Sequence, residues 1–306
     1  MLRITARADL TDNEMTLIDD VLRAVLAQTA HRNNEERRPR MAAETYAMHV
    51  GVDDSERLRL LGRFYDPNSG AFLESAGVAE GHSIVDLGCG HGGVTDRMAS
   101  RVGESGRVYA VDASAEQIEI ARSTLSRHRN VTFVAGALED DPLRGQRVDW
   151  VYSRFLLMHV RDLRRALAAM ADMLTDDGAL LLEIADVGSA QFSPADAGSD
   201  LWLSWWYALG RARGLCFDVA DSIETELEAA GFAIHRRDQY QPISSAREAK
   251  LVHALGFEQC APAYLSEIGA PAERIEAYRQ YLRRVLDDPG VTFALFKSAQ
   301  IIARRR

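Results

Sequence analysis

The chain has 306 residues, of which 47% are hydrophobic and 26% are charged. This composition is ordinary for a globular protein and excludes a collagen-like, coiled-coil or largely disordered chain. Its 36 basic and 45 acidic residues give a net charge of −9. An acidic surface repels nucleic-acid backbones and anionic membranes, so we expect neither as a partner.

The cysteines and the apolar segments narrow the class further. Cys89, Cys216 and Cys260 lie far apart and form no CxxC pair. Such spacing fits neither a disulfide framework nor a zinc site, and it favours a reducing cytoplasm. No apolar run approaches the ~20 residues that span a bilayer. The opening segment, MLRITARADL, lacks the apolar core of a signal peptide.

The first 80 residues are expected to form a helical extension or cap. Apolar residues recur at helical spacing over residues 10–29. The charge run HRNNEERRPR, residues 31–40, is typical of a solvated linker. Residues 53–77 are expected to be helical again, with a break at Asp66-Pro67.

From residue 83 onward, short apolar runs alternate with helical patterns. Near-continuous apolar strands separated by helices predict a parallel sheet covered on both faces. With right-handed crossovers this is an α/β, doubly wound, Rossmann-like fold. The expected strands are 83–88, 107–112, 131–136, 148–153 and 178–186, and the expected helices are 93–101, 114–127 and 162–173.

The pattern loosens after residue 186, although no domain boundary is visible within residues 81–306. We expect a helix over 219–232, a sixth strand over 232–240, a helical stretch over 246–288 and a seventh strand over 291–305. Insertions at about 187–218 and 241–290 are expected to shape a pocket for a small molecule.

The strongest motif is a glycine-rich loop, IVDLGCGHGGV, at residues 84–94. Glycine lets the backbone approach a ligand closely, and the helix that follows offers free N–H groups. The spacing of Gly88, Gly90 and Gly93 also matches the dinucleotide pattern GxGxxG, which is weak on its own. Asp86 would oppose a pyrophosphate in this crevice, whereas a cationic or zwitterionic ligand such as S-adenosylmethionine tolerates it.

The segment VDLGCGHGG resembles motif I of the class I S-adenosylmethionine-dependent methyltransferases. The resemblance implies a seven-stranded sheet whose last strand runs antiparallel. It also implies that Asp112, at the end of RVYAVD, accepts hydrogen bonds from the ribose hydroxyls. A surface aspartate that caps the helix beginning at residue 114 fits the sequence as well. By the same resemblance, the cofactor contacts include Asp86, Gly88, Cys89, Gly90, Ala113 and Gln117.

Two later segments extend this resemblance. FVAGALED (133–140) is similar to the motif after the third strand, where many members carry an aspartate for the adenine amino group. Ala137 stands at that position here, so the backbone near Ala137 and Leu138 would contact the adenine. DWVYSRFLLMHV (149–160) is similar to the fourth-strand motif and places Ser153 and Arg154 beside the glycine loop.

Two side chains are predicted to act near the transferred methyl group. His159 follows the fourth strand, and its ordinary pKa near 6.5 suits a general base. The alternative is a histidine that packs or orients the loop. Tyr46 resembles the tyrosine that closes over the sulfonium in similar enzymes, or else it packs under the cap.

An aromatic segment, LWLSWWYALGRARGLCF (201–217), is the remaining feature of interest. Trp202, Trp205 and Trp206 recur at i, i+3 and i+4, so they share one face of a helix, and Tyr207 follows. This face predicts either a core or dimer contact, or an apolar wall for a flat aromatic acceptor.

Together these features predict a cytoplasmic S-adenosylmethionine-dependent methyltransferase without a metal. The expected acceptor is a small, aromatic or hydrophobic metabolite of indole or phenol type, methylated on carbon, nitrogen or oxygen. A nicotinamide-dependent oxidoreductase and a non-catalytic S-adenosylmethionine-binding module are the alternatives. A homodimer could form through the N-terminal helix or the aromatic segment.

Overall fold

The computed structural model describes residues 54–195 and 201–306. By its contacts the chain divides into two units, Met1–Arg40 and Met41–Arg306, and every described residue lies in the second. The predicted helix 10–29, the charge run 31–40 and Tyr46 lie outside the described residues. The division at residue 80 stays a prediction.

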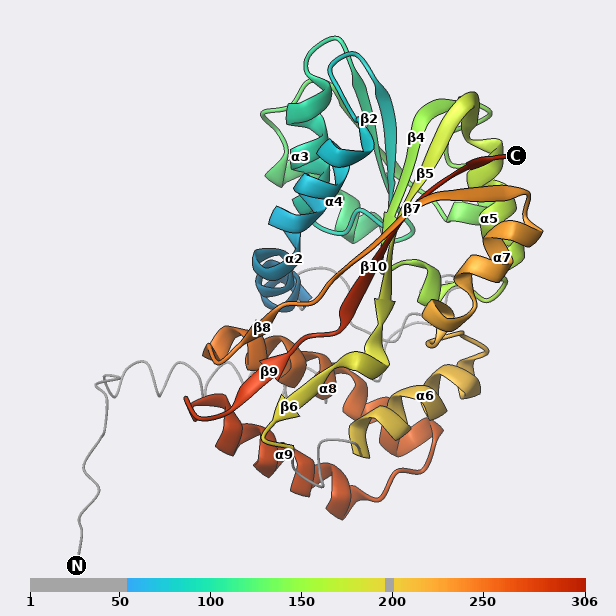
Figure 1. Ribbon diagram of the computed structural model, residues 1–306. Coiled ribbons are helices and arrows are strands. Elements are labelled where there is room, and N and C mark those ends of the chain that lie inside the picture. Colours follow the sequence, from blue (N-terminus) through green and yellow to red (C-terminus); the bar gives the residue numbers. More distant parts are fainter. Residues whose placement is uncertain (1–53, 196–200) are drawn as a thin grey trace, which may run out of the picture. The chain divides into compact units, whose positions relative to one another are not determined.

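A seven-stranded sheet forms the centre of the described chain (Figure 1). Its strand order is β3-β2-β1-β4-β5-β10-β7, and β10 runs antiparallel to both of its neighbours. The predicted doubly wound fold and its antiparallel last strand are therefore confirmed. The strands are β1 (Ser83–Leu87), β2 (Arg107–Asp112), β3 (Val131–Ala135), β4 (Val148–Arg154), β5 (Leu174–Asp186), β7 (Phe232–Tyr240) and β10 (Lys297–Arg305).

Helices cover both faces of this sheet, which is why its strands are apolar on both sides. Ile84 and Val85 point to opposite faces, and both are fully buried. One face is covered by α2 (Ser55–Ala76), α3 (Gly93–Val102) and α4 (Ala115–Thr124), and the other by α5 (Leu163–Asp172) and α7 (Ile223–Ala229).

The helix α2 corrects one prediction, because it continues through Pro67 without the expected break at Asp66-Pro67. A proline inside a helix costs about 3 kcal/mol. Here the residues on both sides of it are buried, Tyr65 before and Phe72 and Leu73 after. Packing of both halves outweighs the lost backbone hydrogen bond.

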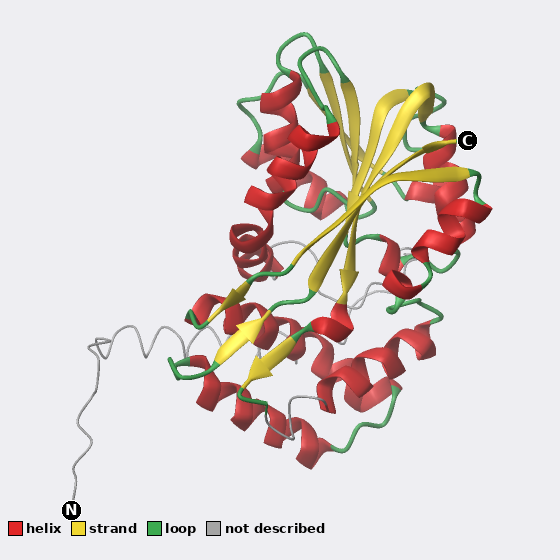
Figure 2. Cartoon of the chain, in the orientation of Figure 1, coloured by secondary structure: helices red, strands yellow, loops and turns green. Residues whose placement is uncertain are grey.

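Beyond the carboxyl ends of the parallel strands lies a second layer of helices with a small sheet (Figure 2). The small sheet has the order β6-β9-β8 and was not predicted from the sequence. The layer contains β6 (Gln191–Ser193), α6 (Leu201–Arg213), β8 (Ile243–Ser244), α8 (Arg247–Glu267), α9 (Ala272–Leu286) and β9 (Thr292–Ala294).

Three predicted elements are subdivided in the structure. The stretch 246–288 is two helices, separated at Gly269, which has a φ of +65°, and Pro271. The expected strand 291–305 is β9 followed by β10, which belong to different sheets. The expected helix 219–232 is a 3-10 turn, Val219–Asp221, followed by α7.

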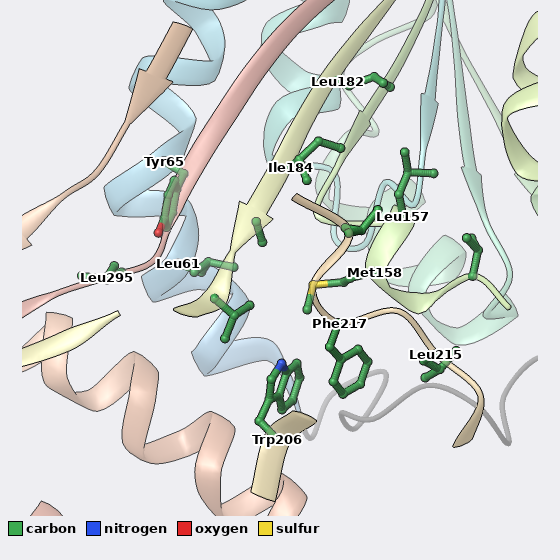
Figure 3. Packing of buried hydrophobic residues seen from close by; sticks show 14 of the residues in the cluster. Leu61, Tyr65, Leu157, Met158, Leu182, Ile184, Trp206, Leu215, Phe217 and Leu295 are labelled. Atoms are coloured by element: carbon green, nitrogen blue, oxygen red, sulfur yellow. The ribbon is translucent and has the colours of Figure 1, made fainter. Parts of the chain in front are cut away.

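One hydrophobic core joins the large sheet to this second layer. It runs without interruption from Leu180 and Leu182 of β5 to the tryptophans of α6 and the tyrosines of α9. Figure 3 shows the junction, where Leu157, Met158 and Phe217 lie between the strand ends and Trp206.

Candidate functional site

The glycine loop connects β1 to α3 in a conformation that side chains resist. Gly88, Gly90 and Gly92 have φ angles of +75°, +52° and +87°. The N–H groups of Gly88 and Cys89 donate to the Val111 carbonyl at 2.8 and 3.0 Å. A Cβ on Gly88 would lie 3.2 Å from a methyl carbon of Leu156. The loop is thereby held against the end of β2.

Asp112 ties this loop to the next strand–helix connection. Its Oδ2 accepts a hydrogen bond from the Gly90 N–H at 3.0 Å, and its Oδ1 accepts one from the Ser114 N–H at 2.9 Å. Burial raises the pKa of this carboxyl group. Asp112 thus braces Ser114, the residue that caps the start of α4. Its oxygens keep further lone pairs for a ligand hydroxyl, and the ribose role stays a prediction.

Asp86 lies deeper than Asp112. Its side chain is buried, and Oδ2 accepts a hydrogen bond from the Thr95 hydroxyl at 2.6 Å. Burial raises the pKa of Asp86 to about 6. A cationic ligand nearby would favour the ionised form and lower this pKa.

Several polar atoms around the loop are buried without a hydrogen-bond partner. They are Nε2 of His91, Oε1 of Gln117 and Oγ of Ser153. A buried polar atom left unsatisfied costs roughly 1–3 kcal/mol, so a polar ligand that supplies its partner is favoured. These atoms, with the open lone pairs of Asp112, fit a cofactor that carries hydroxyl and amino groups.

The carboxyl end of β3 lies at the same edge of the sheet as the glycine loop. The Gly136 N–H donates to the Asp112 carbonyl at 2.9 Å, which places Ala137 and Leu138 next to the end of β2. Leu138 is buried, Ala137 is half-buried and Ala113 is exposed. The backbone of this segment is therefore available at the edge where the glycine loop lies.

Arg154 is engaged by a residue that the sequence analysis did not single out as functional. Its Nη1 lies 2.8 Å from Oδ1 of Asp66 and donates to the Ser69 hydroxyl at 3.0 Å. A Cβ on Gly93 would lie 2.7 Å from Oδ2 of Asp66. Asp66 thus ties α2 to β4 and lies close to Gly93, the first residue of α3. No local pattern reveals this contact, because the two charged residues are 88 positions apart.

Glu183 of β5 is a second buried group that sequence reasoning missed. Its carboxylate accepts hydrogen bonds from the hydroxyls of Tyr152 at 2.8 Å and Ser298 at 3.3 Å. Burial raises its pKa. The sequence does contain a sign of this buried group, because Glu183 interrupts the otherwise apolar run GALLLEIAD.

His159 lies in the 3-10 turn Leu157–His159 that follows β4. Its ring meets Phe217 edge to face, with 5.9 Å between the ring centroids. Burial, and then the positive charge of Arg57, lower the pKa of His159 to about 3. The expectation of an ordinary pKa near 6.5 is therefore wrong, and the imidazole is neutral at physiological pH.

The aromatic face of α6 packs inside its own chain. Trp202 meets His253 at 4.6 Å between centroids, and Trp206 stacks on Phe217 at 4.2 Å. Trp205 lies among Phe257, Tyr264 and Tyr278 of α8 and α9. All three tryptophans are buried, whereas Tyr207 is half-buried, with its hydroxyl beside Gly188.

Over residues 54–195 and 201–306, no group of three or more metal-ligating side chains comes together. In the same part of the chain no helix combines the length and apolarity needed to cross a membrane.

Comparison with known proteins gives a family match. Residues 84–178 match the family model described as a methyltransferase domain. An uncharacterised 37.1 kDa protein in a transposon of Streptomyces fradiae is 33% identical over 110 residues, covering 36% of this chain and 32% of that protein. The ubiquinone/menaquinone biosynthesis C-methyltransferase UbiE of Hahella chejuensis is 32% identical over 113 residues, covering 36% and 45%.

The matched region thus spans less than half the length of these curated relatives. Among solved structures, a candidate methyltransferase from Bacillus halodurans C-125 superposes with a TM-score of 0.52 at 19% identity, covering 76% of this chain and 96% of that one. At this identity the likeness concerns the fold alone.

Proposed function

We propose that this chain, whose residues 84–178 place it among the class I S-adenosylmethionine-dependent methyltransferases, methylates a small hydrophobic or aromatic molecule. The family and its cofactor, S-adenosylmethionine, are as predicted from the glycine loop. The observation that carries the proposal is the hydrogen bond that the Gly90 N–H donates to Asp112. It joins the glycine loop to the carboxylate that we assign to the ribose hydroxyls, and both residues lie within the matched range 84–178.

The cofactor would be held by groups at the ends of β1 to β4. Asp112 would accept the ribose hydroxyls, and Gln117 and Ser153 would use the oxygens that now lack partners. Asp86 would offset positive charge, while the backbone at Ala137 and Leu138 would contact the adenine. Arg154 would act indirectly, by holding α2 through Asp66. When bound, S-adenosylmethionine supplies a methyl group activated by its sulfonium.

The acceptor would lie between β4, α6 and the start of α2. His159 and Trp206 are the described residues that we assign to it, with Tyr207 at its margin. The packing of Trp202 and Trp205 against α8 and α9 makes them supports for this wall. Acceptor and donor must be held in line with water excluded, which an aromatic enclosure favours.

A screen tests this function directly. The purified chain is incubated with labelled S-adenosylmethionine and a panel of phenols, indoles and aliphatic controls, and products are read by mass spectrometry. The Gly90→Val variant serves as the negative control, since valine resists the φ of +52° at this position. Transfer to an aromatic acceptor is expected. Cofactor binding without transfer to any acceptor would favour the non-catalytic module, and nicotinamide binding would favour the oxidoreductase.

His159 supplies a sharper test of the same site. We expect His159→Ala to lower turnover by about 10²-fold, the lower end of the range for a positioned base, because its pKa of about 3 makes it a weak proton acceptor. The affinity for S-adenosylmethionine should stay within about twofold.

His159→Asn separates the two roles of this side chain. If His159 positions the acceptor through a hydrogen bond, asparagine retains most of the turnover. If it removes a proton, asparagine loses as much as alanine does. Equal loss of cofactor affinity in both variants would place His159 under the cofactor and contradict the assignment.

A further inference from the structure

Two buried polar atoms outside the cofactor region lack a hydrogen-bond partner. They are Nε1 of Trp206 on α6 and Oε1 of Gln259 on α8. These two helices pack against each other. Buried polar groups in folded proteins are nearly always satisfied, so an unsatisfied pair on facing elements calls for an explanation.

The orientation of the Gln259 amide is fixed by its neighbours. Its Nε2 donates to Oδ1 of Asp54 at 2.8 Å. The same carboxylate accepts from Nε and Nη2 of Arg57 at 2.6 and 2.5 Å, and it is fully buried. Since an ionised carboxylate only accepts hydrogen bonds, the amide nitrogen must face Asp54. Oε1 therefore faces away from Asp54 and needs a donor.

Trp206 is the complementary group. Its ring stacks on Phe217 at 4.2 Å, which fixes the plane of the indole, and its N–H can only donate. Phe217 in turn contacts His159, and the charge of Arg57 reaches His159 strongly enough to lower its pKa. Ring contacts therefore run from Trp206 through Phe217 to His159, which lies in the turn after β4. Hydrogen bonds separately connect Arg57 through Asp54 to Gln259, and the charge of Arg57 acts on His159.

From this arrangement we infer that Trp206 and Gln259 select an acceptor that carries an uncharged hydroxyl group on an aromatic ring. The inference rests on the proposed function, and it names the substrate class of the same site. A hydroxyl oxygen accepts from the indole N–H, and a hydroxyl hydrogen is donated to Oε1 of Gln259. A methyl ether satisfies only Trp206, and a plain hydrocarbon ring satisfies neither group.

The charges around the site exclude ionised ligands. Asp54 and Arg57 pair with each other, and His159 is neutral at physiological pH. A carboxylate or an ammonium group would be buried there without a counter-charge, which strongly disfavours its binding. The aromatic rings of Trp206 and Phe217 favour a flat apolar body for the rest of the ligand.

Three fluorinated probes test the assignment: 4-fluorophenol, 4-fluoroanisole and 4-fluorotoluene. Their binding to the full chain, saturated with S-adenosylhomocysteine, is measured by fluorine NMR. Each hydrogen bond should contribute roughly five- to tenfold in affinity, so the order should be phenol, then anisole, then toluene. Trp206→Phe should abolish the preference for anisole over toluene. Gln259→Met should abolish the preference for phenol over anisole.

Matched substitutions elsewhere provide the controls. Trp150→Phe removes an indole N–H that donates to His82, and Gln146→Leu removes an amide that accepts from Tyr109. Both variants should keep the wild-type order of affinities. If Gln259→Met fails to fold, the Trp206→Phe variant still tests the inference. In it, 4-fluoroanisole and 4-fluorotoluene should bind with equal affinity.

Equal affinities of the three probes for the wild-type chain, or no binding of any of them, would overturn the inference. So would a wild-type order of affinities in both Trp206→Phe and Gln259→Met. The measurement requires no methyl transfer. Loss of S-adenosylhomocysteine binding, followed separately by calorimetry, would instead contradict the proposed function.

Discussion

At the scale of single residues, Asp112 has the clearest role to test. Its two oxygens already accept backbone N–H groups from two different loops, so they are positioned before any ligand arrives. Pre-positioned carboxylates form strong, charge-assisted hydrogen bonds with hydroxyl groups.

We expect Asp112→Ala to weaken S-adenosylmethionine binding by about ten- to a hundredfold, from the loss of ~1–3 kcal/mol of hydrogen bonding. Calorimetry measures the affinity directly. Asp176→Ala, which alters an exposed aspartate on β5, is the control and should bind normally. Unchanged affinity in the Asp112→Ala variant would remove this residue from the site.

Asp86 makes the stability of the chain depend on pH. Its pKa is raised from 3.8 in the unfolded chain to about 6 in the folded one, so the folded state holds its proton more tightly. This contribution to stability is fully present below pH 3.8 and is lost as pH rises through about 6.

The variant Asp86→Asn keeps an acceptor for Thr95 but cannot ionise. Relative to the wild type, its free energy of unfolding should rise between pH 4 and pH 7 by up to ~3 kcal/mol and stay level above that. Urea unfolding at a series of pH values measures this difference. A difference that does not change with pH would mean that Asp86 titrates alike in both states.

Local motifs reveal only part of the site. The glycine loop and Asp112 are predictable because a strand, a tight turn and a helix start follow one another in the sequence. Asp66 and Gln259 are not predictable in this way, since their roles arise from partners 88 and 205 positions away. The low pKa of His159 likewise depends on burial by segments distant in sequence.

At the scale of elements, α2 is held to the sheet by a polar clamp as well as by its apolar side. Asp66 and Arg154 are each less than a fifth exposed, and the Ser69 hydroxyl completes the contact. Removing one partner of a buried ion pair leaves the other without compensation.

We expect Asp66→Asn to lower the free energy of unfolding by roughly 2–4 kcal/mol, because the Arg154 charge stays in a poorly solvated place. Chemical denaturation measures the change. The exposed pair of Arg147 and Asp176 is the comparison, and Arg147→Ala should cost less than ~1 kcal/mol. Equal effects of the two substitutions would show that the clamp contributes no more than a surface pair.

The elements differ in how far the sequence predicts them. The parallel strands are recognisable because burial on both faces favours unbroken apolar runs, as in Ala179 to Leu182. The strands β6, β8 and β9 have only two or three residues each, too few to show a periodicity. The continuation of α2 through Pro67 depends on tertiary packing, which local propensity does not include.

At the scale of the whole molecule, the continuous core has a thermodynamic consequence. The same cluster contains Leu180 of the large sheet and Trp205 and Tyr278 of the second layer. Neither part can lose its packing without exposing the apolar surface of the other. Cooperative unfolding of both layers is therefore expected.

Urea unfolding followed by two signals tests this expectation. In a Trp150→Phe variant, tryptophan fluorescence reports on the three tryptophans of α6, and far-ultraviolet circular dichroism reports on all helices and strands. The two midpoints should coincide within error. A tryptophan transition at lower urea would show that the second layer unfolds independently and that the shared core does not couple the layers.

The place of β10 also bears on how the chain is made. This strand lies between β5 and β7, yet it follows every other strand of the large sheet in chain order. During translation, β5 and β7 must therefore wait with unpaired edges until residues 297–305 have left the ribosome. Exposed strand edges recruit other chains. The nascent protein is thus most vulnerable to aggregation just before this last strand emerges, and slow synthesis of this segment would prolong that interval.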